Sequence, residues 1–157
     1  MPVTPGSPLR RVIASGLGAG LVPRRLWGSD AGAGTVGAAV AAGVALVLWP
    51  LPVAVHLAAT AGAVTLSLWA PRPFLATDQD PQWVAIDEVA GALLALTGLR
   101  GLPWIVAWFA FRAADIWKRL PGVAAAERLP GSLGVTADDL VAGVYALGAG
   151  WLLTWLT

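Results

Sequence analysis

The sequence of 157 residues contains no cysteine, a single histidine and few charged residues. Without cysteine the chain can form no disulfide, no zinc–thiolate site and no cysteine nucleophile. Charged residues make up only 12% of the chain, whereas they are about a quarter of a soluble domain. The formal net charge of +1 argues against a nucleic-acid partner, because nucleic-acid-binding domains carry a basic stripe on one face.

Hydrophobic residues, in contrast, make up 57% of the chain, which predicts a membrane protein. A helix needs about 20 apolar residues to cross the bilayer core, so the chain has room for four or five spans in one compact bundle. We therefore expect an all-α, polytopic membrane protein with a single domain over residues 1–157. Residues 1–31 are expected to be a retained interfacial segment, because their apolar part is too short and glycine-rich for a signal peptide.

Charges and prolines divide the remaining chain into expected spans. These cover residues 32–49, 53–69, 83–99, 102–117 and 140–156. When the spans alternate in direction, every lysine and arginine except Arg100 falls on one side, which the positive-inside rule makes cytoplasmic.

Three acids lie unusually deep in this scheme. Asp87, Glu88 and Asp115 are expected about one turn inside their helices, at the cytoplasmic leaflet. A carboxylate at a helix centre costs about 2.5 to 3.5 kcal/mol on insertion scales, so something must compensate it. Oxygen ligands in a chain without cysteine suit a hard ion such as Mg²⁺. His56 is expected near the outer end of its span, too far away to contribute.

Two cations accompany the acids, and they suggest a phosphate ligand. Arg112 and Lys118 follow on the next expected span, and an arginine next to a metal ion can clamp phosphate oxygens. At headgroup depth such a phosphate would belong to a lipid. The stretch "GAGTVG", residues 32–37, opens a helix on the same side, where free N–H groups favour an anion.

Simpler explanations exist for each group. Asp87 and Glu88 could form a structural salt bridge with Arg112, and Arg112 could pair with Asp115 as an i,i+3 surface pair. Thr136 could cap a helix that has Asp138 and Asp139 in its first turn.

Three motifs occur in an informative order: "DPQWVAIDEVAG", "FRAADIWKRLP" and "GSLGVTADDLVAGVYA". Together they resemble the phosphatidylglycerophosphatase A family, bacterial Mg²⁺-dependent enzymes that remove the terminal phosphate of phosphatidylglycerophosphate. The residues that match the family's motifs are Asp80, Asp87 and Glu88 in the first, Arg112, Asp115 and Lys118 in the second, and Asp138 and Asp139 in the third.

The resemblance implies a lipid phosphatase of the bacterial inner membrane, with its active site facing the cytoplasm and a phospholipid substrate. The expected Mg²⁺ ligands are Asp87, Glu88, Asp115 and Asp139. Asp80 and Asp138 are expected to be further ligands or the base that orients water, and Thr35, Arg112 and Lys118 are expected to hold the phosphate.

Two other functions are compatible with buried acids. One is a subunit of a small cation- or proton-coupled transporter, which would need a pathway to both faces of the membrane. The other is a structural partner protein with salt-bridged helices. The sequence leaves the oligomeric state open.

Overall fold

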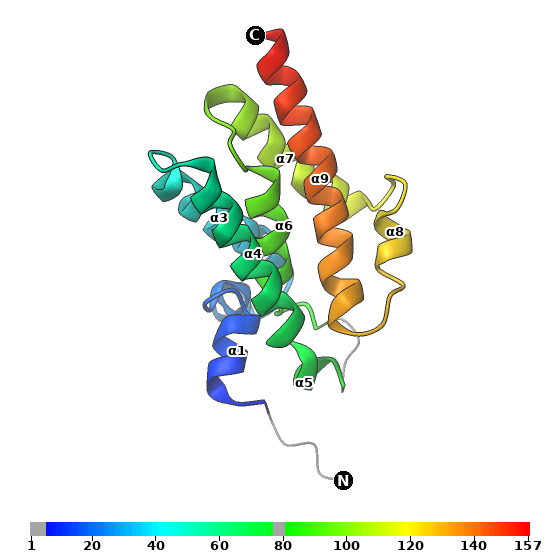
Figure 1. The fold of residues 1–157 in the computed structure, drawn as a ribbon. Coiled ribbons are helices and arrows are strands. Elements are labelled where there is room, and N and C mark those ends of the chain that lie inside the picture. The colour runs from blue at the N-terminus through cyan, green and yellow to red at the C-terminus, as the bar shows by residue number, and fades with distance from the viewer. Residues whose placement is uncertain (1–5, 77–80) are drawn as a thin grey trace.

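The computed structural model describes residues 6–76 and 81–157, and this part of the chain forms helices and loops without a strand (Figure 1). The helices are α1 Pro8–Ala14, α2 Val22–Trp27, α3 Ala33–Leu48, α4 Val53–Trp69, α5 Arg72–Leu75, α6 Ile86–Ala95, α7 Gly101–Trp117, α8 Val123–Ala126 and α9 Ser132–Leu156, with a 3-10 turn, η1, at Ala19–Leu21. The expected all-α class is confirmed.

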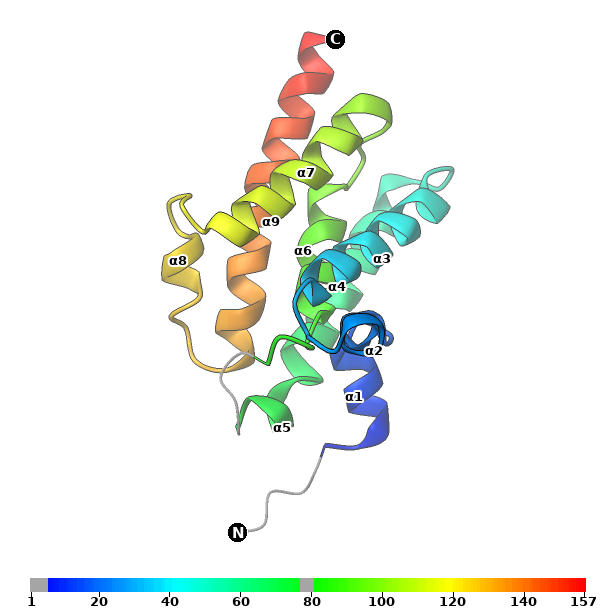
Figure 2. The ribbon, with the colours of Figure 1, turned by 180° about the vertical axis from the view of Figure 1, so that it is seen from behind.

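Helix α6 is the centre of the bundle, with α3, α4, α7 and α9 packed around it (Figures 1 and 2). Of its ten residues only Glu88 and Leu94 are partly exposed. At 1.5 Å per residue a helix of this length is about 15 Å long, roughly half of the hydrocarbon core of a bilayer. The helix is therefore shorter than the expected span 83–99, because the chain turns after Ala95, with Gly98 in the left-handed conformation at φ 71°.

Glycines allow α9 to approach α6 closely. A methyl group added at Gly91 would lie 2.7 Å from the carbonyl oxygen of Asp139, and one added at Gly143 would lie 2.6 Å from the carbonyl oxygen of Gly91. Small residues at such positions let helix backbones come together. This contact fixes the height of Asp139 relative to the first turn of α6.

Two helices of the described chain are long and apolar enough to cross a membrane. They are the continuous segment Val53–Leu75, which includes α4 and α5, and α9. Helix α3 is apolar but has only 16 residues. The structure thus contains two candidate spans, where the sequence suggested four or five.

The helix boundaries agree closely with the sequence at α3, α4 and α7. Helix α9 begins earlier than expected, at Ser132, so Asp138 and Asp139 lie in its second turn. Thr136 is buried in this helix, and its hydroxyl group lies 2.6 Å from that of Ser67. The proposal that Thr136 caps the helix is therefore wrong.

The N-terminal segment packs against the loop that leads into α6. The amide of Ala85 donates a hydrogen bond of 2.9 Å to the carbonyl oxygen of Ala14. A methyl group at Gly20 would lie 2.0 Å from the carbonyl oxygen of Trp83. These contacts position the loop just before Asp87.

Candidate active site

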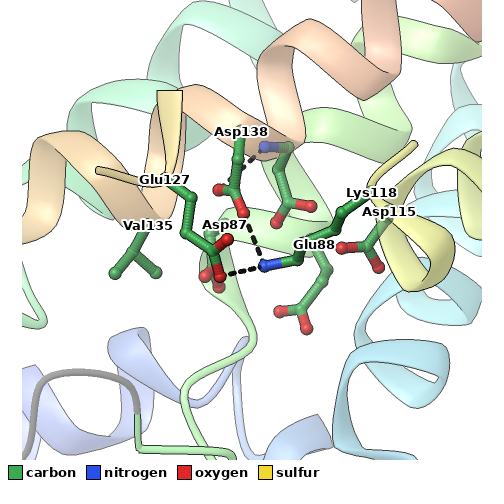
Figure 3. Close-up of a pocket in the computed structure, with 8 residues that line it drawn as sticks. Asp87, Glu88, Asp115, Lys118, Glu127, Val135 and Asp138 are labelled. Carbon is green, nitrogen blue, oxygen red and sulfur yellow. Dashed lines mark hydrogen bonds and ion pairs between the residues drawn. The ribbon is translucent and has the colours of Figure 1, made fainter. Parts of the chain in front are cut away.

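A cavity of about 240 Å³ lies where α6, α7 and α9 meet (Figure 3). Its lining residues are Asp87, Glu88, Asp115, Lys118, Glu127, Val135, Asp138 and Asp139. The structure thus brings together five acids from three helices that the sequence singled out, along with one of the two cations.

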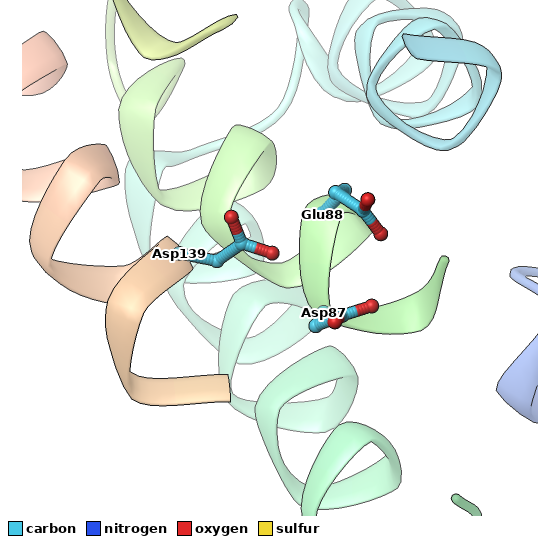
Figure 4. A group of neighbouring side chains, drawn as sticks. All are labelled: Asp87, Glu88 and Asp139. Atoms are coloured by element: carbon cyan, nitrogen blue, oxygen red, sulfur yellow. The ribbon is translucent and has the colours of Figure 1, made fainter. Parts of the chain in front are cut away.

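Three of these acids form a closer group, in which two residues of α6 meet one residue of α9 (Figure 4). Asp87, Glu88 and Asp139 each offer a carboxylate oxygen, and these oxygens lie within 4.8 Å of one another. Asp87 and Asp139 are buried and Glu88 is partly buried. Carboxylates so close together repel one another unless protons or a cation neutralise them.

The oxygens of this group fit a hard divalent cation. Glu88 Oε2 and Asp139 Oδ1 are buried and have no hydrogen-bond partner among the described residues. Mg²⁺ binds oxygens at about 2.0–2.1 Å, so two opposite ligands are about 4.2 Å apart. The limit of 4.8 Å in this group exceeds this distance and also the distance of about 3.0 Å between adjacent octahedral ligands, so the side chains would have to move inward to share one ion.

Asp138 is adjacent to this group but is engaged differently. Its Oδ2 accepts a hydrogen bond of 3.0 Å from Lys118 Nζ, and its Oδ1 accepts one of 3.0 Å from the amide of Asp139. Asp138 therefore connects the three-carboxylate group with the cation at the end of α7.

Lys118 ends α7 in a left-handed conformation, with φ of 48°. This conformation is uncommon outside glycine, and residues held in it often belong to functional sites. Its Nζ lies 2.5 Å from Glu127 Oε1 and 3.0 Å from Asp138 Oδ2 (Figure 3). Burial lowers the pKa of the Lys118 ammonium, but the hydrogen bonds to Glu127 and Asp138 raise it more, so its pKa lies above the ordinary value.

Arg112 lies beside the cavity and links α7 to α3. It forms the i,i+3 ion pair with Asp115 on its own helix, but both side chains are largely buried, so this is not the surface pair of the simpler explanation. Its Nη2 also donates a hydrogen bond of 3.3 Å to Thr35 Oγ1. The expected phosphate-binding residues Thr35 and Arg112 are therefore in contact.

The start of α3 must be small to accommodate this arrangement. A methyl group added at Gly34 would lie 2.1 Å from Glu88 Oε1 and 3.2 Å from Arg112 Nη2. The "GAGTVG" stretch thus meets the acids, as its position in the sequence suggested.

Asp80 lies outside the described residues. Glu127, in contrast, was not among the predicted site residues, but it reaches Lys118 from the loop after α8. An acid in a connecting loop carries no sequence signal of its own, so only the fold reveals this contact.

His56 is remote from the acids. It is buried on α4 and lines a separate small cavity with Trp49 and Arg100. The expectation that histidine takes no part in the acidic site agrees with this position.

Comparison with known proteins finds relatives of this chain. The family model described as phosphatidylglycerophosphatase A matches residues 12–154. A Bacteroides thetaiotaomicron protein named "Putative phosphatidylinositol-3-phosphatase" is 34% identical over 146 residues, which cover 86% of this chain and 87% of the relative. No solved structure matches. The family match covers most of the chain and includes all three helices that supply the acids, so the protein belongs to the phosphatidylglycerophosphatase A family.

Proposed function

We propose that the protein is a Mg²⁺-dependent phosphatase that hydrolyses the terminal phosphomonoester of phosphatidylglycerophosphate to phosphatidylglycerol and phosphate. Membership of the family implies lipid phosphatase activity. The observation that carries the proposal is the group of Asp87, Glu88 and Asp139 with Lys118 in the same cavity. Clustered carboxylates next to a cation suit a phosphate ester and a metal ion together.

In this proposal Asp87, Glu88 and Asp139 hold Mg²⁺, and Asp115, which lines the same cavity and pairs with Arg112, is a further ligand. When bound, the ion would polarise the phosphoryl oxygens and lower the pKa of a water molecule. Asp80 and Asp138 are the candidates for a further ligand or for the base that orients this water.

The cations bind the substrate's phosphate. Lys118 contributes a point charge inside the cavity, and Arg112 contributes a planar donor group that Thr35 orients. In hydrolysis the oxygen of water bonds to phosphorus, the bond from phosphorus to the glycerol oxygen breaks, and that oxygen receives a proton. Holding the phosphate and water together supplies much of the rate enhancement.

We also propose that the protein lies in the bacterial inner membrane with this cavity at the cytoplasmic leaflet. The two candidate spans and the bias of basic residues toward one side support this placement. A cavity at headgroup depth would admit the phosphate of a lipid without removing its acyl chains from the bilayer.

The name of the Bacteroides relative supplies a second candidate substrate, phosphatidylinositol 3-phosphate. This lipid also carries a phosphomonoester on its headgroup, so the same groups could act on it. The two substrates differ in the alcohol that leaves, a glycerol in one and an inositol in the other.

The test is phosphate release by the detergent-purified protein from each lipid, with Mg²⁺ and then with excess chelator. We expect metal-dependent release with a higher kcat/KM for phosphatidylglycerophosphate. Faster release from phosphatidylinositol 3-phosphate would identify that lipid as the preferred substrate. Equal release with and without chelator would show that the reaction needs no metal ion. No release from either lipid by a folded sample would overturn the proposal and favour the alternative of a cation- or proton-coupled transporter subunit. Ion flux into vesicles that contain the protein would then test that alternative.

A further inference from the structure

An apolar groove lies on the face of α6 opposite to the acidic cavity. It has a volume of about 270 Å³, and all of its lining residues are apolar. Ile86, Val89 and Leu93 form its floor on α6. With 3.6 residues per turn, the mean direction of these three positions lies about half a turn from that of Asp87 and Glu88. The groove is therefore separate from the proposed active site.

The walls of the groove come from α3 and α4, with α1 and its following turn at one end. On α4 the lining runs from Ala59 to Leu66, about 10 Å along the helix. One leaflet of the hydrocarbon core is about 15 Å deep. The groove is thus long enough to hold a large part of one acyl chain.

Two arginines of α1, Arg10 and Arg11, precede Ile13, the residue of this helix that lines the groove. The Arg10 guanidinium lies 4.3 Å from the ring centroid of Trp69, which is one turn beyond Leu66 on α4. The Arg11 guanidinium lies 5.6 Å from the ring centroid of Trp83. Tryptophan and arginine together are typical of the level of lipid headgroups.

The groove also faces the region where lipid is expected. Helix α4 belongs to a candidate span. Leu17 is 73% exposed, Val44 37% and Leu66 39%. Apolar side chains this exposed at the rim of an apolar groove indicate a ligand or the membrane itself.

We propose that this groove binds one acyl chain of an anionic phospholipid of the surrounding membrane, with its phosphate on Arg10 and Arg11. This lipid is not the substrate, because its site lies across α6 from the acids. The inference rests on the proposed membrane placement and does not depend on hydrolysis. Since Ala85 bonds to Ala14, the bound lipid would also hold α1 against the loop that precedes Asp87.

Gly62 offers a direct way to fill the groove. It lines the groove, and a methyl group added there would meet nothing within 4 Å. The Cβ of Gly62→Leu therefore meets no neighbour within 4 Å, and the longer side chain takes up space at the groove that Gly62 lines. Gly43 on α3 is also free of neighbours within 4 Å but does not line the groove, so Gly43→Leu is the matched control.

The probe is dioleoylphosphatidylserine, which is neither the proposed substrate nor its product, and dioleoylphosphatidylcholine is its zwitterionic counterpart. Native mass spectrometry of the detergent-purified protein measures the bound lipid. We expect one phosphatidylserine on the wild-type protein and on Gly43→Leu, and at least tenfold weaker binding to Gly62→Leu. Gly62→Ala, a smaller change, is expected to weaken binding less and serves if the leucine variant does not fold.

The headgroup contact is tested with Arg10→Gln/Arg11→Gln, and the exposed pair Arg25→Gln/Arg119→Gln makes the same change in charge elsewhere. We expect only the first variant to lose the preference for phosphatidylserine over phosphatidylcholine. Equal binding to the wild-type protein and to the folded Gly62 variants would overturn the groove as the site. Equal binding of the two lipids to the wild-type protein would overturn the role of the arginines. Neither result would bear on the proposed phosphatase activity, which the phosphate-release assay tests separately.

Discussion

Asp139 brings a second helix to the two acids of α6, and its buried Oδ1 has no partner among the described residues. We expect Asp139→Asn to reduce kcat/KM by at least about 100-fold, more than the loss of a group that only supports a metal ligand. Isothermal titration with Mg²⁺ should show weaker binding by the same variant. Asp30→Asn is the control, because Asp30 pairs with Arg24 away from the cavity. Unchanged Mg²⁺ affinity in Asp139→Asn would contradict the ligand assignment.

Lys118 is expected to bind phosphate as a cation at every pH at which the enzyme is assayed. Its pKa is raised by Glu127 and Asp138 in spite of burial, so the ammonium deprotonates only well above pH 9. We expect Lys118→Met to raise KM about tenfold, by an equal factor from about pH 6 to 9, and Lys118→Arg to keep part of the affinity.

The same shift affects stability, and its sign follows from the raised pKa. The contribution of Lys118 is fully present below the pKa of an unfolded lysine, near 10.4, and is lost as the pH rises through the higher folded-state value.

A KM ratio between Lys118→Met and the wild-type protein that fell steeply below pH 9 would show that the lysine is already neutral there, against this assignment.

Most of the individual acids could be predicted from the sequence, because carboxylates inside apolar runs need compensation wherever the helices lie. Five of the predicted acids share one cavity with Lys118. The contact of Glu127 with Lys118 could not be predicted, because it depends on which backbone segments approach one another, which a single sequence does not encode locally.

At the scale of helices, the contact between α6 and α9 determines whether the acids meet. Gly91→Ala would place a methyl group 2.7 Å from the Asp139 carbonyl oxygen, and overpacking of this kind costs about 1–3 kcal/mol. Gly148→Ala on α9 meets nothing within 4 Å and is expected to stabilise its helix by about 0.5–1 kcal/mol. Thermal unfolding in detergent should therefore shift in opposite directions for the two variants, with activity reduced only in Gly91→Ala. An equal shift in both would mean that the contact is not tight.

The helix boundaries show where sequence reasoning succeeded and where it failed. For α3, α4 and α7, prolines and charges lie at the ends of the apolar runs, and these signals act locally. Helix α6 is shorter than its apolar run, and α9 begins earlier than its own. For α9 packing against other helices decides, as the contact of Thr136 with Ser67 illustrates.

At the scale of the whole molecule, the proposed membrane placement makes a prediction about which turns face which side. Helix α3 is about 24 Å long, which is short for a hydrocarbon core of about 30 Å. The turn after α3 is tied to the turn before α7, because Trp49 Nε1 donates a hydrogen bond of 2.9 Å to the Leu99 carbonyl oxygen and Arg100 bonds to the Trp49 carbonyl oxygen. The two turns therefore lie on the same side, at the end of the molecule away from the acids.

The absence of cysteine makes this arrangement testable with single cysteines. Leu51→Cys lies in the turn between α3 and α4, and Arg128→Cys lies between α8 and α9; both positions are exposed. The positive-inside rule predicts that a membrane-impermeant maleimide labels Leu51→Cys in intact cells but labels Arg128→Cys only after permeabilisation. The cysteine-free parent should remain unlabelled throughout. If Leu51→Cys also required permeabilisation, α3 and α4 would form a hairpin that enters and leaves by the cytoplasmic side, as the short α3 would then allow.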